Sequence, residues 1–365
     1  MYKKFFLVFL FCLFTSTIII AQENINSWDN YSGVKLNGKV KSIHGVQYDV
    51  HKTGTIEKNQ KGFASYTEKL NEAGNITEVT SFNEKGKENS KQIFKYNISG
   101  KLIEYRDSAF GSVTVQTYKY DDKGNKTEKC KQNKSGKIFE KYINSFDSNG
   151  NLIEHKVYGI DGVLQETIKY KYDDNGNLTE VVKYASNNLP ESTEAYKYNE
   201  KGKKITYSFY NKDYILEKTS VYLYDEKDSL DEIERFDAFG KLISKDIFGY
   251  DANGNLISEN DFDANGNITF KTSYMYILLT PYVREKTTVN ESGYKNTLVY
   301  DDQYIKEGNK IIIEDNTYNP DGSLDFQKIK NYEYDDKGNW IKETSISFAD
   351  KNPDFIVTRE IEYYN

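Results

Sequence analysis

The chain has 365 residues and a formal net charge of −7, with 49 Lys and Arg against 56 Asp and Glu. A mildly acidic chain repels phosphate backbones, so we expect no nucleic-acid partner. Its 32 tyrosines and 20 phenylalanines argue against intrinsic disorder, because disordered segments are poor in aromatic residues.

The N-terminus has the pattern of a secretory signal peptide. Lys3 and Lys4 precede an apolar run from Phe5 to Ile20, which ends at the small residue Ala21. The run is shorter than the roughly 20 residues that a spanning helix needs. We therefore expect residues 1–21 to be a cleaved signal peptide. The mature chain would then have no transmembrane span, a net charge of −9 and an exported location: periplasmic, cell-surface or extracellular.

Residues 22–36 show no repeat and are expected to form an N-terminal tail or cap. Just beyond them, the run Gly33 to Val40 mimics a phosphate loop. It lacks the final Ser or Thr that would hold magnesium, and no apolar strand precedes it. We interpret it as a turn, and we expect residues 37–365 to form a single β domain.

A repeat of 26 residues dominates the middle of the chain. Two series of turn positions alternate with gaps of 12 and 14, without insertion from Gly124 to Gly266. The first series is Gly124, Gly150, Gly176, Gly202, Asp228 and Gly254, and the second is Gly136, Gly162, Asn188, Tyr214, Gly240 and Gly266. Such a fixed period indicates a repeat architecture in which each unit stacks on its neighbours.

Each repeat is predicted to be two antiparallel strands. Residues 163–172 alternate polar and largely apolar side chains, which is typical of a half-buried strand. The following Asp173 to Gly176 is a turn sequence, in which Asp bonds its own backbone and Gly takes a positive φ. No long window has the three- and four-residue spacing of a helix.

Apolar and aromatic residues recur in columns across these strands. Counting by parity places the leucine and tyrosine columns on one face, which predicts aromatic ladders along a shared side of the sheet. The columns are Leu152, Leu178, Leu230 and Leu256; Tyr158, Tyr184, Tyr210, Phe236 and Phe262; Tyr170, Tyr196, Tyr222 and Phe248; and Tyr120, Tyr172, Tyr198, Tyr224 and Tyr250. By this logic Lys156→Leu should be tolerated and Tyr172→Asp should not.

The repeat weakens toward both ends and is interrupted near residue 280. There the segment Ile277–Lys286 replaces the usual acidic turn. We interpret it as a degenerate repeat, and a recognition loop is the functional alternative. On the order of twenty strands are expected in all. Since open twisted sheets rarely exceed about 10 strands, the fold class predicted is an all-β antiparallel meander rolled into a spiral or barrel-like sheet.

Several segments resemble the Rhs/YD-repeat family. They are Phe248-Gly-Tyr-Asp-Ala-Asn-Gly-Asn-Leu, Tyr170-Lys-Tyr-Asp-Asp-Asn-Gly-Asn-Leu and Tyr332-Glu-Tyr-Asp-Asp-Lys-Gly-Asn-Trp, and variants of the motif cover most of the chain after about residue 37. The resemblance implies strands of a β-shell, a bacterial surface location and a link to carbohydrate binding. The chain lacks a recognisable self-cleavage segment and a following toxin domain, so it is similar to a short member without a toxin.

No side-chain pattern indicates catalysis or a metal site. His44, His51 and His155 have no His-Glu-x-x-His spacing, and one cysteine in the mature chain, Cys130, cannot build a zinc cluster or an internal disulfide. We interpret the histidines as surface or sheet residues, and we expect no cofactor, no metal and no catalytic residue.

Two acidic patterns have a structural and a functional interpretation. The turns at Asp251 and Asp263 are rich in oxygen ligands, but Gly stands fourth rather than sixth as in an EF-type calcium loop. Glutamates recur four residues after glycines, and this repetition favours sheet positions paired with Lys or Tyr hydroxyls over a catalytic pair. They are Glu78, Glu104, Glu128, Glu154, Glu180, Glu140 and Glu166.

The leading hypothesis is therefore an exported, non-catalytic binding module whose ligand is a glycan or a surface protein. A purely structural envelope scaffold is the alternative, and a glycosidase-like enzyme is a third, less favoured hypothesis. The direction of the tyrosines discriminates between them. Hydroxyls exposed in a groove favour binding there, whereas packed rings place any binding site elsewhere.

Overall fold

A computed structural model describes residues 36–50, 52–109, 111–277, 280–289, 295–300, 303–307, 310–318, 324–347 and 353–365. Residues Leu36–Asn365 form one compact unit. The expected signal peptide and the expected tail up to residue 35, together with His51 and the expected turns at Gly293, Gly308, Gly322 and Asn352, lie outside the described residues.

The described residues form 25 strands in a single sheet. The first of them are β1 (Val40–Asp49), β2 (Ala64–Leu70), β3 (Ile76–Asn83), β4 (Glu88–Tyr96), β5 (Leu102–Ala109), β6 (Ser112–Tyr120), β7 (Lys126–Asn133), β8 (Ile138–Phe146) and β9 (Leu152–Tyr158). The regular repeats continue with β10 (Leu164–Tyr172), β11 (Leu178–Ala185), β12 (Pro190–Tyr198), β13 (Lys204–Asn211), β14 (Leu216–Tyr224), β15 (Leu230–Asp237), β16 (Leu242–Tyr250), β17 (Leu256–Asp263) and β18 (Ile268–Ile277). The last are β19 (Thr280–Val289), β20 (Lys295–Tyr300), β21 (Gln303–Glu307), β22 (Lys310–Tyr318), β23 (Leu324–Tyr334), β24 (Trp340–Ser347) and β25 (Phe355–Tyr363).

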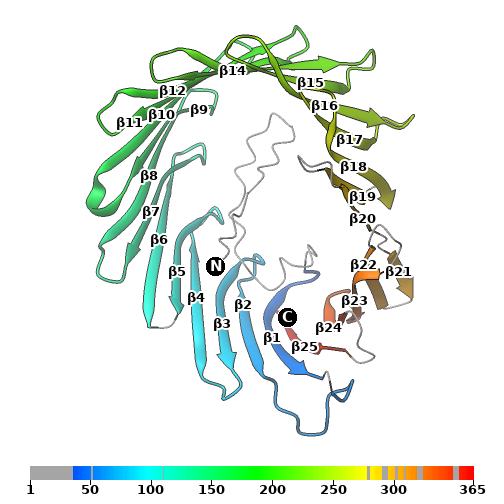
Figure 1. Cartoon of the computed structure of the whole chain (residues 1–365). Helices are drawn as coiled ribbons and strands as arrows, with labels where there is room; N and C mark the ends of the chain where they lie inside the picture. The colour runs from blue at the N-terminus through cyan, green and yellow to red at the C-terminus, as the bar shows by residue number, and fades with distance from the viewer. Residues whose placement is uncertain are drawn as a thin grey trace, which may run out of the picture. The chain divides into compact units, whose positions relative to one another are not determined.

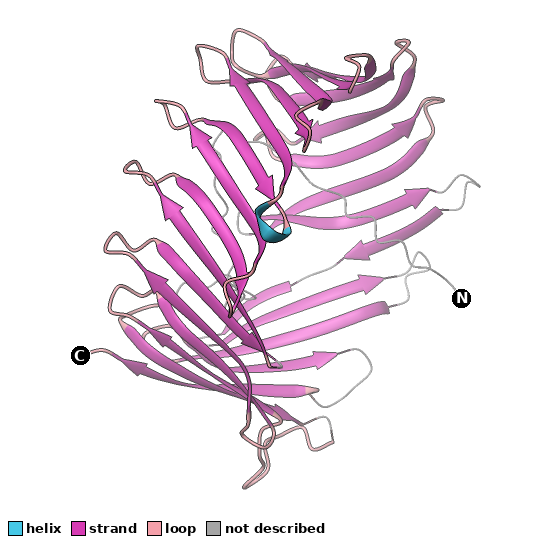
Figure 2. Cartoon of the chain, turned by 90° about the vertical axis from the view of Figure 1, so that its left-hand side faces the viewer, coloured by secondary structure: helices cyan, strands magenta, loops and turns pink. Residues whose placement is uncertain are grey.

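The strands form an antiparallel meander, which confirms the predicted fold class. Each strand pairs with the next along the chain, except that β20 and β21 both pair with β22. The last strand also pairs with the first, with Ile43 of β1 opposite Ile361 of β25, so blue and red strands are neighbours in Figure 1. The sheet therefore rolls back on itself. Its hairpins are short, and one contains the 3-10 turn η2 (Ile160–Gly162), cyan in Figure 2.

The turn register matches the sequence prediction at every exception. Asn188, Tyr214 and Asp228 replace glycine in the series, and their φ angles are 61°, 59° and 65°. Glycine at the equivalent Gly176 has φ 82°. The left-handed conformation is therefore required by the turn itself, and these side chains accept a backbone region that disfavours them.

The described part of the interrupted segment is strand, and residues 278–279 between the two strands lie outside the described residues. β18 extends to Ile277 and β19 begins at Thr280, and these two residues are directly opposite each other. Pro281 likewise lies opposite Tyr276. The sequence Thr280–Val289 continues the meander, so a degenerate repeat is the better interpretation of this segment.

The prediction of one shared aromatic face is wrong. In the unbroken part of the β10–β11 ladder, Tyr184 lies opposite Thr167 and Val181 lies opposite Tyr170. Opposed residues share a face, and residues an odd number apart on a strand point to opposite faces. Tyr184 and Tyr170 therefore project from opposite sides of the sheet.

A β-bulge near the start of most strands is the physical reason. Tyr172 pairs with Leu178, but Lys171 pairs with Glu180, which leaves Thr179 as an extra residue. The extra residue reverses the relation between parity and face along the rest of the ladder. Parity counted across the turn therefore assigned the column of Tyr184 to the wrong side.

Burial is concentrated where the first and last strands meet. One fully buried cluster contains Val40, Ile43, Tyr66 and Leu70, and another contains Tyr332, Trp340 and Val357. In the regular repeats most aromatic rings are only half-buried, although Phe94, Tyr118 and Phe248 are buried. The rolled sheet therefore does not hide all of its aromatic rings from water.

Candidate functional site

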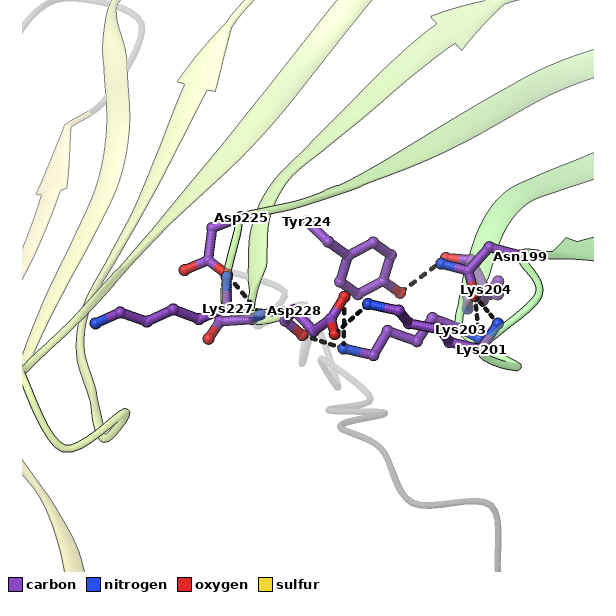
Figure 3. Close-up of polar contacts among 9 residues, drawn as sticks. Asn199, Lys201, Lys203, Lys204, Tyr224, Asp225, Lys227 and Asp228 are labelled. Carbon is purple, nitrogen blue, oxygen red and sulfur yellow. Dashed lines mark hydrogen bonds and ion pairs between the residues drawn. The ribbon is translucent and has the colours of Figure 1, made fainter.

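The Tyr-Asp turns lie along one edge of the sheet, because alternate hairpins of a meander share an edge. Figure 3 shows two neighbouring turns, which begin at Asn199 and Asp225. The Asp225 carboxylate accepts the backbone N–H groups of Lys227 (2.9 Å) and Ser229 (2.7 Å). Aspartate at this position therefore satisfies the polar backbone of the turn.

Lysines join several of these turns to the next one along the edge. The Nζ atom of Lys201 lies 2.6 Å from Oδ2 of Asp228, and Lys203 donates to the backbone carbonyl of Asp228 (Figure 3). Lys203 also lies over the Tyr224 ring, 5.2 Å from its centroid. The hydrogen bond from Lys201 lowers the pKa of the Asp228 carboxyl. Lys101 repeats this arrangement, with its Nζ atom 2.5 Å from the Gly124 carbonyl oxygen.

The tyrosine before each turn donates its hydroxyl to the backbone of the preceding strand. The acceptors are carbonyl oxygens at 2.6–2.9 Å, and the pairs are Tyr96 with Ile76, Tyr120 with Leu102, Tyr172 with Leu152, Tyr198 with Leu178, Tyr224 with Lys204 and Tyr250 with Leu230. Partial burial raises the pKa of Tyr96 to about 12. These hydroxyls therefore remain protonated donors within the fold.

One repeat shows that this hydrogen bond is required. Phe146 occupies the tyrosine position and has no hydroxyl, and Asn144 instead donates its side-chain amide to the Lys126 carbonyl at 2.8 Å. The substitute keeps the exposed end of the strand tied to its neighbour. The tyrosine column is therefore structural, and any ligand-binding site lies elsewhere.

Six of the repeated glutamates form ion pairs with lysines, as predicted for sheet positions, and five of these pairings cross between strands, whereas Lys156 and Glu154 lie on the same strand. Their partners within 4 Å are Lys69 and Lys91 for Glu78, Lys95 for Glu104, Lys119 and Lys141 for Glu128, Lys156 for Glu154, Lys183 for Glu166 and Lys171 for Glu180. Burial alone would raise the pKa of Glu128, but hydrogen bonds from its two lysines hold the pKa below its ordinary value. A carboxylate held ionised in this way is a poor general acid.

One carboxyl pair has a different environment. Asp246 and Asp261 lie directly opposite each other on β16 and β17. Arg235 binds both oxygens of Asp246, at 2.7 and 2.5 Å. Burial, then the charges of Asp246 and Glu259, raise the pKa of Asp261 to about 6. Sequence spacing alone did not reveal this pair, because it arises from register between two strands.

The pair does not form the acid and base of a glycosidase. Asp246 is already neutralised by Arg235, which leaves a single carboxyl group with a raised pKa. An acid–base mechanism needs a second carboxylate that is free to act. The pair is therefore better understood as a strained contact within the sheet.

The side chain of His155 and the oxygen-rich turn at Asp251 are engaged by local contacts. Nδ1 of His155 lies 2.7 Å from Oδ1 of Asn144, and the imidazole stacks on Tyr142 with ring centroids 5.3 Å apart. Burial lowers the pKa of His155. The Asp251 carboxylate accepts the backbone N–H and the side-chain amide of Asn255, each at 2.9 Å. Both of its oxygens, which could otherwise bind calcium, therefore accept hydrogen bonds within the turn. Over the described ranges, no three metal-ligating side chains meet.

A surface hollow of about 480 Å³ lies between two neighbouring Tyr-Asp turns. Tyr118, Tyr120, Lys101, Lys119 and Asp121 are among its lining residues. Lys101 and Tyr120 already contact each other across it, with Nζ 5.1 Å from the ring centroid. The hollow therefore arises from the stacking of neighbouring turns, and its lining side chains already contact each other.

Aromatic exposure is greatest at the opposite edge of the sheet. Tyr214, in the turn between β13 and β14, is 63% exposed and stacks on Tyr210, with centroids 4.7 Å apart and planes 7° apart. This flat pair offers a face on which a sugar ring could stack. Among the described residues, no helix is long and apolar enough to cross a lipid bilayer.

Comparison with known proteins gives one partial family match. A family described as "Uncharacterised protein" matches residues 129–277. No curated protein matches the chain.

Solved structures show only distant similarity. The TcdB2-TccC3-Cdc42 structure is 14% identical with a TM-score of 0.37, over 85% of this chain and 20% of that one. A porin-like protein from Bacteroides uniformis is 10% identical with a TM-score of 0.21, over 90% of this chain and 99% of that one. A protein of unknown function from Bacteroides fragilis is 19% identical with a TM-score of 0.18, over 42% of this chain and 94% of that one. The chain spans about a fifth of the length of the TcdB2-TccC3 structures.

Proposed function

We propose that this protein is an exported, non-catalytic β-repeat protein that binds a glycan or a surface protein at the cell envelope or outside the cell. The observation that carries the proposal is the use of the repeated polar side chains. The tyrosine hydroxyls, turn aspartates and strand glutamates are engaged by the protein's own backbone and lysines. The repeat motif therefore builds a scaffold, and binding falls to residues that vary between repeats.

The Tyr210–Tyr214 pair supports the glycan branch of this proposal. Tyr214 occupies a turn position where most repeats have glycine, and its exposed ring lies parallel to Tyr210. Tyr214 is exposed and Tyr210 is half-buried, so one ring of the pair is open to a ligand. Stacking on such a surface is the way that amphipathic rings contact sugars.

A glycan array probed with the folded protein tests this branch. Binding to a defined glycan, reduced at least about tenfold by Tyr214→Ser, is the expected result for a stacking residue. Tyr198→Phe is the matched control, because its ring is part of the scaffold and its loss of a hydroxyl should leave glycan binding unchanged. Silence on the array, with no protein retained from envelope extract, would contradict a binding role.

A purely structural envelope scaffold is the second candidate. It is favoured by the regular repeats, whose side chains are mostly half-buried. Their polar groups form hydrogen bonds and ion pairs within the protein, which leaves few of them for a ligand. This candidate predicts no ligand in either experiment, together with altered envelope integrity when the protein is removed. Fractionation of the producing cells tests the export that both candidates share.

A further inference from the structure

A row of exposed apolar side chains follows the edge opposite the Tyr-Asp turns. Val163, Leu189 and Ile215 occupy the same position in three successive repeats, one residue after the positive-φ residue of each turn. They are 64%, 61% and 60% exposed. Phe239, in the next turn along this edge, is 96% exposed. We call these four residues the apolar turn row.

The row is a departure from the repeat pattern. At the Tyr-Asp edge, the residue after the positive-φ position is polar in the successive turns, being Asn125, Asn151, Asn177, Lys203, Ser229 and Asn255. The apolar turn row therefore places aliphatic side chains where the fold itself accepts polar ones. Exposed apolar groups that gather in one place usually mark a contact surface.

The geometry of the row suits a flat partner. Successive turns at one edge are two strands apart, or roughly 10 Å. Val163, Leu189 and Ile215 therefore extend over roughly 20 Å. They stand in successive hairpin turns along one edge of the sheet, where an extended surface would face them.

Lysines flank the row at both ends. Lys137 and Lys241 hold the equivalent positions in the preceding and following repeats, and Lys134 and Lys212 lie in turns of the same edge. Lys134, Lys212 and Lys241 are exposed. The same turns also contain Asp161, Asp213 and Asp237. The Asp237 carboxylate accepts the backbone N–H groups of Phe239 and Lys241, which reduces its reach toward a partner.

This charge pattern disfavours a second copy of the chain. In a two-fold pairing centred on Leu189, Lys137 of one molecule would meet Lys241 of the other, and like charges would oppose each other at both ends. A sugar is also a poor partner, because Val, Leu and Ile offer neither a flat ring nor a hydrogen bond. Aliphatic tips with an aromatic residue and flanking lysines fit the boundary between anionic headgroups and acyl chains.

We infer that the apolar turn row docks the protein onto a lipid bilayer that contains anionic headgroups. Val163, Leu189, Ile215 and Phe239 enter the boundary between headgroups and acyl chains. Lys134 and Lys241 contact the headgroups. This inference goes beyond the proposed ligand-binding role and does not depend on a glycan or protein ligand.

A fluorescent label at the row tests the inference locally. The mature chain, residues 22–365, carries Cys130→Ser and receives a single cysteine through Leu189→Cys, labelled with nitrobenzoxadiazole. Ile98→Cys is the matched control, because Ile98 is 107% exposed in a turn of the opposite edge. With vesicles of phosphatidylcholine and phosphatidylglycerol, emission at position 189 should shift to shorter wavelength and position 98 should not change.

Vesicle flotation of unlabelled protein supplies the second measurement. Val163→Ser combined with Leu189→Ser and Ile215→Ser should reduce partitioning at least about tenfold, while Ile98→Ser leaves it unchanged. Lys134→Gln with Lys241→Gln should weaken binding only to vesicles that contain phosphatidylglycerol. All variants are the mature chain, residues 22–365, because the apolar run from Phe5 to Ile20 would itself partition into vesicles.

The outcomes of these experiments distinguish a lipid bilayer from a second copy of the chain as the partner of the apolar turn row. A shift at position 189 without vesicles, rising with protein concentration, would assign the row to a second copy and overturn the inference. An equal shift at positions 189 and 98, or no shift at 189, would overturn it as well. A glycan or protein ligand found by array or pull-down leaves these results unaffected, so the two proposals fail independently.

Discussion

Removing the Asp261 charge should stabilise the protein, although most substitutions in a sheet destabilise. Asp261 lies opposite Asp246, and its Oδ1 atom is buried with no hydrogen-bond donor among the described residues. Its pKa rises from 3.8 to about 6, first through burial and then through the charges of Asp246 and Glu259. The ionised carboxylate is therefore disfavoured in the folded chain.

The shift gives the magnitude. A difference of about 2 pKa units corresponds to about 3 kcal/mol of folding free energy lost at neutral pH. Asp261 is partly exposed, and solvent screening reduces this figure to about 1–2 kcal/mol. Asp261→Asn should therefore raise the free energy of unfolding by about 1–2 kcal/mol at pH 8, because the amide carries no charge and can donate to Asp246.

The sign fixes the pH window. The folded state binds the Asp261 proton more tightly than the unfolded state, so this group's contribution to stability falls as pH rises from about 4 to about 6. The gain from Asp261→Asn should be large above this window and absent below it. Other carboxyls, such as Glu128 with its lowered pKa, also make stability depend on pH. Their contribution is the same in variant and parent, so it cancels when the two are compared at each pH.

Urea unfolding followed by circular dichroism measures the difference at pH 8 and at pH 4. Asp263→Asn is the matched control, two residues along the same strand. Its carboxylate accepts the side-chain amide of Asn267 at 2.9 Å and its pKa is lowered, so the same substitution should destabilise. A destabilised Asp261→Asn at pH 8, or a gain equal at both pH values, would refute the reasoning.

The remaining predictions concern the scaffold. Tyr198→Phe should lower the free energy of unfolding by about 1 kcal/mol, because the Leu178 carbonyl loses its donor, and unchanged urea unfolding would contradict this. Asn188→Gly should raise the thermal midpoint of unfolding and the free energy of unfolding by up to about 1 kcal/mol, because glycine adopts the left-handed φ of 61° without strain. A lower midpoint would show that Asn188 is unstrained in this turn. Tyr172→Asp should cost about 3 kcal/mol or more through lost ring burial and a lost hydrogen bond, whereas Lys156→Leu should stay within about 1 kcal/mol. Similar unfolding midpoints for these last two variants would contradict the assignment of the tyrosine column to the scaffold.

Turn chemistry explains why so much of the fold was predictable. The 12 and 14 residue spacing located hairpins even where glycine is absent, as at Tyr214, because a hairpin tip needs one residue in the left-handed region. The repeated glutamates were likewise predicted as paired sheet positions, since a catalytic group is needed once and a structural one recurs. Both features depend on neighbours in sequence or on the repeat itself.

The site residues were less predictable because they depend on register. Asp246 and Asp261 are 15 residues apart, and only the pairing of β16 with β17 makes them opposite. The hydroxyl of Tyr198 was expected to report on ligand binding, but its partner is a backbone carbonyl that no sequence pattern marks. The apolar turn row was not predicted, because the exposure of its side chains depends on their place at the hairpin tips.

The sequence by itself determined the strands, their hairpins and the repeat, because these follow from local turn conformations and a period that the residues display directly. The tertiary structure alone decided which side of the sheet each ring occupies. One extra residue, such as Thr179, shifts the ladder by a single position and exchanges the two faces, and alternation counted along one strand cannot detect a mismatch with the next. It also brought β25 beside β1, since pairing between the ends of a chain depends on the accumulated twist of all the strands between them.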